Sequence, residues 1–182
     1  MKQRSVIELS KDISCKAYVQ HGFIPQIENN TQIAGVCPFC GRDDNPFYVN
    51  KKTKQWDCKS CGKSGGFKTF LKDIVTLCKS NFKGGIAVAL SRKKNIKIKT
   101  LKYFNVGYNK ITNNYCIPIY FSDGKLIDIR RYNDKKMQST SYCTIGLFGL
   151  IKNLPENIYL CEGEWDTMIM YEILSNLNIE NS

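Results

Sequence analysis

The sequence has only one histidine and five prolines among its 182 residues, and it has no run of 18 or more apolar residues. The missing apolar run excludes a membrane-spanning helix of ordinary length. The amino-terminal segment MKQRSVIELSKD also lacks the apolar core of a secretory signal peptide. The lone His21 precedes Gly22 at the end of an expected helix, where capping explains it better than catalysis. We therefore expect a cytoplasmic protein without a membrane partner.

Acidic residues are few compared with basic ones, 16 against 27, and the excess positive charge is unevenly distributed. Residues 1–35 carry a net charge of +1, residues 36–136 carry +15, and residues 137–182 carry −5. A basic body followed by an acidic end is typical of a protein that holds a polyanion and supplies carboxylates separately. A lysine-rich soluble protein without that role would show the same excess, so charge alone leaves both interpretations open.

Hydrophobic periodicity indicates short strands mixed with helices, which is an α+β fold. Helices are expected over residues 5–20, 67–77 and 165–177, and a polar, basic linker or solvated face over residues 80–100. Strands are expected over residues 46–49, 55–58, 115–121, 125–131 and 158–161. The turn Ser122-Asp123-Gly124 predicts a hairpin. The last helix is expected to pack against the sheet through Met168, Ile169, Ile173, Leu174 and Leu177.

The nine cysteines are an odd number, which argues against a disulfide framework in a reducing cytoplasm. Four of them form two Cys-x-x-Cys pairs with 17 residues between the pairs: Cys37, Cys40, Cys58 and Cys61. Each pair can place two thiolates on one tight turn, and two such turns close a tetrahedron around a metal ion. This predicts a zinc ribbon, with iron as the chemical alternative. Four cysteines leave no position for water, so the zinc is expected to be structural.

Aromatic residues and lysines are interleaved across the predicted ribbon hairpin. Phe47, Tyr48 and Trp56 lie among Lys51, Lys52, Lys54 and Lys59. Aromatic faces can stack on unpaired bases while lysines meet the phosphates, so Tyr48 and Trp56 are candidates for binding template or nucleotide. The competing interpretation is that these rings form the small core of the ribbon itself.

The segment LIDIRRYNDKK supplies three further candidates for binding phosphate: Arg130, Arg131 and Lys136. Because side chains alternate along a strand, Arg130 is expected to point away from the apolar face and Arg131 toward it, unless the strand ends there. A guanidinium can bind a phosphate through two hydrogen bonds. A solvated basic edge strand is the competing interpretation.

Three carboxylates follow the last expected strand, in YLCEGEWDTMIMYE. Glu162 would emerge at the carboxyl end of that strand, where open α/β sheets bind ligands. Glu164 and Asp166 fall at the start of a helix, where the macrodipole favours negative charge with or without catalysis. Taken alone, the segment fits either a metal or proton-transfer site or a set of helix-start acids.

The order of these features resembles the bacterial-type replicative primases, and especially the primase half of phage primase–helicases. CPFCG and WDCKSCGKSGGFKTFL resemble the zinc-binding module of that family. YFNVGYNK, CIPIYF and LIDIRRYNDKK resemble the first subdomain of its catalytic core, and LFGL followed by IYLCEGEWDTMIMYE resembles the opening of its Toprim fold. This divides the chain into a helical leader (1–34), a zinc-ribbon module (35–66), a helix and basic linker (67–100), the first core subdomain (101–155) and the start of a Toprim fold (156–182).

The resemblance implies a DNA primase, which makes short RNA primers on single-stranded DNA. Catalytic roles would fall to Glu162, Glu164 and Asp166, with Glu162 as general acid/base or metal-associated group. It also implies structural Zn²⁺ on the four cysteines, catalytic Mg²⁺, and contacts of Arg130 and Lys136 with nucleotide or template. The implied partners are single-stranded DNA, ribonucleoside triphosphates and a fused or separate replicative helicase, in the cytoplasm of a bacterial or infected host cell.

The Toprim fold of the family continues to an Asp-x-Asp strand that binds most of the magnesium. The residues up to Ser182 contain neither that pair nor a helicase P-loop, so we expect a Toprim fold that is incomplete here. A second hypothesis is a non-catalytic zinc module that binds single-stranded DNA and recruits or regulates replication proteins. A Toprim-containing topoisomerase or nuclease fits the ribbon-first order less well.

Overall fold

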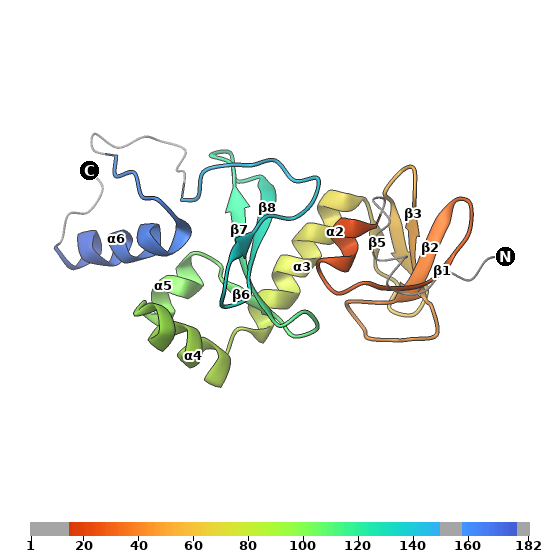
Figure 1. Cartoon of the computed structure of the whole chain (residues 1–182), viewed down its shortest axis with the longest axis horizontal. Coiled ribbons are helices and arrows are strands. Elements are labelled where there is room, and N and C mark those ends of the chain that lie inside the picture. Colours follow the sequence, from red (N-terminus) through yellow and green to blue (C-terminus); the bar gives the residue numbers. More distant parts are fainter. Residues whose placement is uncertain (1–14, 150–157, 178–182) are drawn as a thin grey trace.

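Two antiparallel sheets form the frame of the molecule in the computed structural model, which describes residues 15–149 and 158–177 (Figure 1). The first sheet consists, in order, of β1 (Ile24–Glu28), β2 (Gln32–Val36), β3 (Phe47–Asn50), β4 (Trp56–Cys58) and β5 (Ser64–Gly65). The second consists of β6 (Gly107–Asn109), β7 (Asn114–Tyr120), β8 (Leu126–Tyr132) and β9 (Met137–Gln138). The α+β class predicted from the sequence is confirmed.

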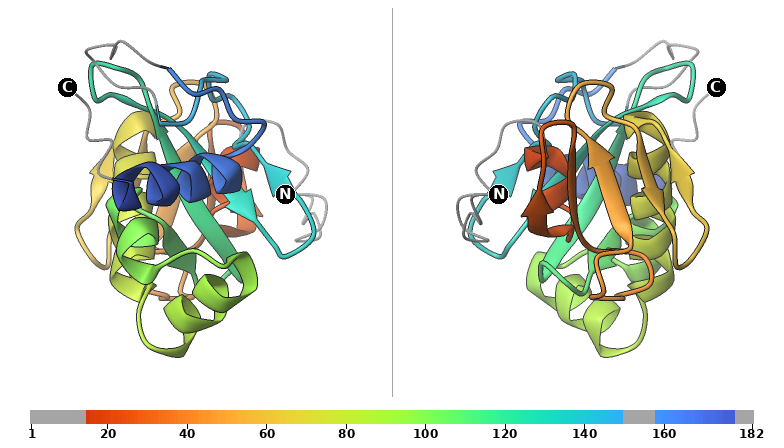
Figure 2. Two further views of the ribbon diagram at one scale, coloured as in Figure 1. Left: turned by 90° about the vertical axis from the view of Figure 1, so that its left-hand side faces the viewer. Right: turned by 90° about the vertical axis from the view of Figure 1, so that its right-hand side faces the viewer.

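The helices are α2 (Lys16–Val19), α3 (Phe67–Asn81), α4 (Gly85–Lys94), α5 (Ile98–Tyr103) and α6 (Glu164–Asn176). The long helix α3 lies between the two sheets and contacts β5 of the first and β6, β7 and β8 of the second (Figures 1 and 2). Within the part of the chain that the structure describes, no helix is long and apolar enough to cross a membrane.

The ribbon sheet is larger than the sequence indicated. The predicted hairpin strands are confirmed as β3 and β4, but residues 24–28 and 32–36 add β1 and β2 to the same sheet. The expected helical leader over residues 1–34 is therefore wrong for these residues. Only α2 lies within the helix predicted over residues 5–20, and residues 5–14 lie outside the described part. The alternation on β1 is weak, with Ile24 and Ile27 both exposed, which hid this strand in the sequence.

Phe70 of α3 lies at the centre of the core that joins the helix to the ribbon sheet. It is fully buried, and the centre of its ring lies 4.5 Å from that of Tyr18, 5.8 Å from Trp56 and 6.2 Å from Phe47. The amphipathic helix predicted from residue 67 is confirmed and continues to Asn81. Burial of its apolar stripe fixes the ribbon against the helix.

Residues 80–100 were expected to be a linker or a solvated face, and this prediction is wrong. They form α4 and the beginning of α5, and Leu90 and Ile96 are buried in the core beneath the second sheet. The basic residues that follow hid this helix, because the apolar residues of α4 form only one short run, Ile86 to Leu90, in its first half. The basic residues of α4 gather in its last turn, where they interact favourably with the helix dipole.

The hairpin predicted around Ser122-Asp123-Gly124 is confirmed as β7 and β8. Gly124 adopts a positive φ of 80°, and the Asp123 side chain accepts a hydrogen bond from the backbone N–H of Lys125 at 2.9 Å. These two features close the turn. The hairpin brings Arg130, paired with the buried Ile117 of β7, into the middle of the second sheet.

Helix α6 is confirmed, but its packing differs from the prediction. It lies against α5, where Tyr171 stacks on Tyr103 with ring centres 4.8 Å apart, and Met168 is its only fully buried apolar residue in the described range. Ile169, Ile173 and Leu177 are exposed rather than packed against a sheet. The predicted strand over residues 158–161 is absent, because no described strand pairs with this segment and a strand needs hydrogen bonds from a neighbour.

A buried polar network fastens the segment before β1 to the second sheet. His21 Nε2 lies 2.8 Å from Thr140 Oγ1, and that hydroxyl donates to the carbonyl of Ile129 at 2.7 Å. The hydroxyl proton is thus used, so His21 Nε2 must be the donor and its ring is the neutral Nε2–H tautomer. Asn109 Nδ2 also donates to the His21 carbonyl at 3.0 Å. The lone histidine therefore has a structural role, but not the helix-capping role expected from the sequence, because its ring contacts Thr140 and not the end of α2.

Acid is expected to loosen this network. Burial of the ring, with the positive charge of Arg131 adding to it, lowers the pKa of His21 to about 3. Between that value and the ordinary pKa of about 6.5, the unfolded chain binds a proton that the folded chain does not, so stability falls as pH falls. With zinc present, the wild type should lose roughly 2 kcal/mol more of its unfolding free energy than His21→Gln between pH 7 and pH 5. Urea denaturation at both pH values measures the difference, and equal losses would contradict this account.

Candidate functional site

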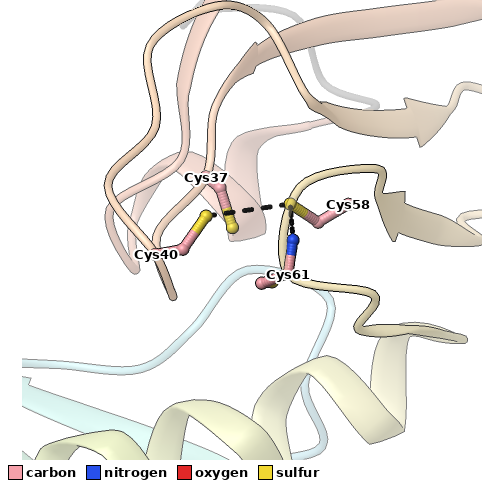
Figure 3. Close-up of side chains that lie close together, drawn as sticks. All are labelled: Cys37, Cys40, Cys58 and Cys61. Atoms are coloured by element: carbon pink, nitrogen blue, oxygen red, sulfur yellow. Dashed lines mark hydrogen bonds between the residues drawn. The ribbon is translucent and has the colours of Figure 1, made fainter.

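The four predicted metal ligands come together at one end of the ribbon sheet (Figure 3). Cys37 follows β2 and Cys58 ends β4, while Cys40 and Cys61 lie in the turns after them. The four sulfur atoms lie within 4.8 Å of one another, and the Sγ atoms of Cys40 and Cys58 are 3.9 Å apart. A tetrahedron with zinc–sulfur bonds of about 2.3 Å requires sulfur–sulfur separations of about 3.8 Å. The cluster fits a zinc ion with little adjustment.

The backbone around the cysteines is arranged to support thiolates. The N–H of Phe39 points to Cys37 Sγ and the N–H of Cys61 points to Cys58 Sγ, both at 3.4 Å. Gly41 and Gly62 complete the two turns at φ values of 70° and 73°, a conformation that favours glycine. Amide hydrogens directed at sulfur stabilise the charged form that metals bind. The two knuckles are therefore equivalent halves of one site.

The four cysteines differ in burial, and this affects their protonation when no metal is bound. Cys37 and Cys58 are buried and Cys40 and Cys61 are exposed, so the site lies at the surface edge of the sheet. Burial raises the pKa of the Cys37 thiol far above its usual value, and a bound divalent ion favours the thiolate instead. Since four sulfurs complete the tetrahedron, the zinc stabilises the fold and leaves no open position for chemistry. The chain is thus a four-cysteine zinc-ribbon protein.

Trp56 is almost fully buried, which contradicts its predicted role in stacking on a template base, although it contributes to the lining of a polar cavity beside Tyr48. Its side chain is buried, its indole N–H donates to the Gly66 carbonyl at 3.1 Å, and its ring stacks on Phe47 with centres 5.3 Å apart. The competing interpretation, that these rings form the core of the ribbon, holds for Trp56 and Phe47. A sheet this small has few other residues with which to build a core.

Tyr48 lies on the opposite face of the sheet and is half-buried beside a polar cavity of about 390 Å³. The cavity is also lined by Gln32, Asn50, Gln55, Asp57 and Ser64. Sequence reasoning missed these polar residues, although the alternation of buried and half-buried positions on β3 and β4 places them on one face. The exposed Lys52 lies in the adjoining loop. The cavity lining thus combines an aromatic ring, amide groups and the Asp57 carboxylate, and Lys52 adds positive charge in the loop beside it.

A second cavity, of about 470 Å³, lies where β8 approaches the start of α6, and three predicted site residues line it: Arg130, Glu162 and Glu164. Arg130 is half-buried, forms an ion pair with the buried Glu164, and donates to the Gly146 carbonyl at 2.9 Å. Glu162 is exposed. Arg130 was expected to point away from the apolar face into solvent. Its guanidinium is instead bound by the Glu164 carboxylate and the Gly146 carbonyl.

The remaining predicted site residues do not line this cavity. Asp166 is exposed in the first turn of α6, as a helix-start acid would be. Arg131 is half-buried and donates to the Ser139 carbonyl at 3.2 Å, and burial lowers its pKa. Lys136 is exposed in the turn before β9, where its N–H donates to the Asn133 side chain at 3.2 Å. The structure thus brings one arginine and two glutamates together and leaves the others apart.

Comparison with known proteins agrees with the zinc-ribbon assignment. The family model described as CHC2 zinc finger, the zinc ribbon of DnaG-type primases, matches residues 1–105, and the chain belongs to this family. Comparison with curated proteins gives no match. Among solved structures, the chain is similar to the Aquifex aeolicus primase (zinc-binding and RNA polymerase domains), at 14% identity and a TM-score of 0.31. That similarity covers 81% of this chain and 56% of the other, so this chain spans little more than half of it.

Proposed function

We propose that this chain is the amino-terminal portion of a DNA primase, which makes short RNA primers on single-stranded DNA. The observation that carries the proposal is membership of the CHC2 zinc finger family over residues 1–105, together with a four-cysteine site of suitable geometry. The net charge of +15 over residues 36–136 supports contact with a nucleic-acid backbone. The cavity that holds Arg130 beside Glu162 supports a nucleotide site in the same chain.

In this proposal one cavity binds the template and the other binds the incoming nucleotide. The face around Tyr48 holds the template, because its ring can stack on an unpaired base and Lys52 can meet a phosphate. Arg130 binds the phosphates of an incoming ribonucleoside triphosphate, and Lys136 contacts nucleotide or template. Glu162 is the general acid/base or metal-associated carboxylate, with Asp166 nearby on α6. Mg²⁺, when bound, neutralises the charge that develops on the phosphates. The protein partner would be a replicative helicase, either fused to the same chain or encoded separately.

The proposal is tested by assaying magnesium-dependent synthesis of oligoribonucleotides on single-stranded DNA. The polypeptide used should include this chain together with any residues that its gene encodes after Ser182. The wild type is expected to make primers and Glu162→Gln is expected to make far fewer. If the wild type binds single-stranded DNA in a salt-dependent manner but makes no primer, the non-catalytic zinc-module hypothesis is favoured instead.

The template face gives a separate prediction. Tyr48→Ala should weaken binding to single-stranded DNA by about 1–3 kcal/mol, the usual contribution of one stacked base, without loss of zinc. Fluorescence anisotropy with a labelled oligonucleotide measures the effect. Phe121→Ala is a matched control, since Phe121 is an exposed aromatic residue in the β7–β8 turn of the other sheet. Equal losses in the two variants would show that binding does not depend on the ribbon face.

A further inference from the structure

The ion pair between Glu164 and Arg130 connects the first residue of α6 to the middle of β8 (Figure 1). The Glu164 side chain is 6% exposed and the Arg130 side chain 21% exposed, so water has little access to either group. The exposed Glu162 is only two residues away and lines the same cavity. The two glutamates of the Glu-Gly-Glu segment thus have very different surroundings, and this suggests different roles.

Packing on both sides holds the pair in place. On the strand side, Arg130 pairs across the sheet with the fully buried Ile117, and its guanidinium also donates to the Gly146 carbonyl at 2.9 Å. On the helix side, Trp165 packs edge-on against Tyr132 with ring centres 5.2 Å apart, and Met168 is fully buried. The guanidinium therefore has two acceptors, one on the first residue of α6 and one in the irregular segment between β9 and α6.

Charge balance assigns the role of each glutamate. A cation that took Glu164 as a ligand would leave the Arg130 guanidinium half-buried without its counter-charge, which is unfavourable. Glu162 is exposed and can accept a cation without breaking this pair. An arginine whose planar guanidinium is already fixed in one orientation loses little conformational freedom when it binds the oxygens of a phosphate.

From these contacts we infer that Glu164 is a positioning residue, which holds Arg130 in the cavity to bind the phosphates of a nucleoside triphosphate, and that it is not a metal ligand. The inference rests on the proposed function for the identity of the ligand. It separates Glu164 from Glu162, although the sequence presents them as one acidic motif. Arg130 would bind phosphate through the second N–H of each Nη, since one Nη also faces Glu164, the other also faces Gly146, and Nε is buried.

The test compares the wild type with Glu164→Gln, Arg130→Gln and the double variant, in the presence of zinc. ATP affinity is measured by calorimetry in solution without divalent cations other than the bound zinc, and the arginine side-chain NMR signals report whether the guanidinium is held. Glu164→Gln should weaken ATP binding about tenfold and broaden the Arg130 signals, because the charge that orients the guanidinium is lost. The double variant should bind ATP no more weakly than Arg130→Gln, because Glu164 acts only through the arginine.

A matched control and a metal titration distinguish the alternatives. Glu172→Gln neutralises another carboxylate on α6, one that accepts a hydrogen bond from Lys97 N–H at 2.6 Å, and should leave ATP affinity unchanged. Manganese affinity, followed by electron paramagnetic resonance, should change less in Glu164→Gln than in Glu162→Gln. Unchanged ATP affinity in Glu164→Gln, a larger loss of manganese binding than in Glu162→Gln, or a wild type that binds no ATP would each overturn the inference. A chain that behaves as expected here but makes no primer would contradict only the proposed function.

Discussion

Removal of zinc is expected to unfold the ribbon sheet rather than merely weaken it. Binding of structural zinc to sites of this type contributes on the order of 10 kcal/mol, which is as large as the whole stability of an ordinary domain. Without metal, burial raises the pKa of the Cys37 thiol, which keeps its proton, and the exposed hydrogen bond from Arg42 Nε to Ser60 Oγ at 2.9 Å is a weak substitute for the metal in joining the two knuckles. The loss should extend into α3, since Phe70 packs on Trp56 and Phe47.

The measurement combines metal analysis with tryptophan fluorescence. The wild type should contain one zinc per chain, and chelation should shift Trp56 emission to longer wavelength as the buried indole meets water. Cys58→Ser should bind zinc poorly and show the shifted emission from the start. Cys161→Ser is the control for loss of a thiol, because Cys161 is half-buried, lies outside the four-cysteine cluster and lines the other cavity. Normal emission and full zinc content in Cys58→Ser would refute the assignment of the ligand, and iron in place of zinc would favour the iron site that the sequence left open as an alternative.

The zinc site could be predicted from the sequence because the residues that form each half of it are close together along the chain. Two Cys-x-x-Cys pairs followed by glycines determine the ligands and the turns, and favour zinc, without knowledge of the rest of the chain. The β7–β8 hairpin is similar, since a short run with Gly124 at positive φ determines the turn. In both cases the residues that determine the structure are close together in the sequence.

Other features depended on contacts between distant segments, and the sequence did not reveal them. Trp56 could stack on a base or fill a core, and only the positions of Phe47 and Phe70 decide for the core. The pairing of Arg130 with Glu164 joins residues 34 positions apart and required the fold. The segment 158–161 has the composition of a strand, but composition does not supply a neighbouring strand.

Substitution of Glu162 by glutamine should cause a large loss of activity without the unfolding that is expected when a zinc ligand is lost. Glutamine has the shape of glutamate but can neither accept a proton at neutral pH nor supply a negative charge to a cation. The usual contribution of such a group to rate is on the order of 10²–10⁴-fold. Because Glu162 is exposed and lines the cavity that holds Arg130, the change should leave the fold intact.

The decisive measurement for Glu162 is the rate of primer synthesis by the complete polypeptide, with single-stranded DNA binding and the unfolding midpoint recorded for the same samples. Glu162→Gln should lose primer synthesis but keep both other properties, because the template face and the zinc site are built from different residues. Glu172→Gln serves again as the control for neutralising a carboxylate on α6. If Glu162→Gln makes primers at the wild-type rate, the catalytic group must be sought elsewhere. The exposed Asp166 would then be the first alternative, because it lies one helical turn further along the same segment.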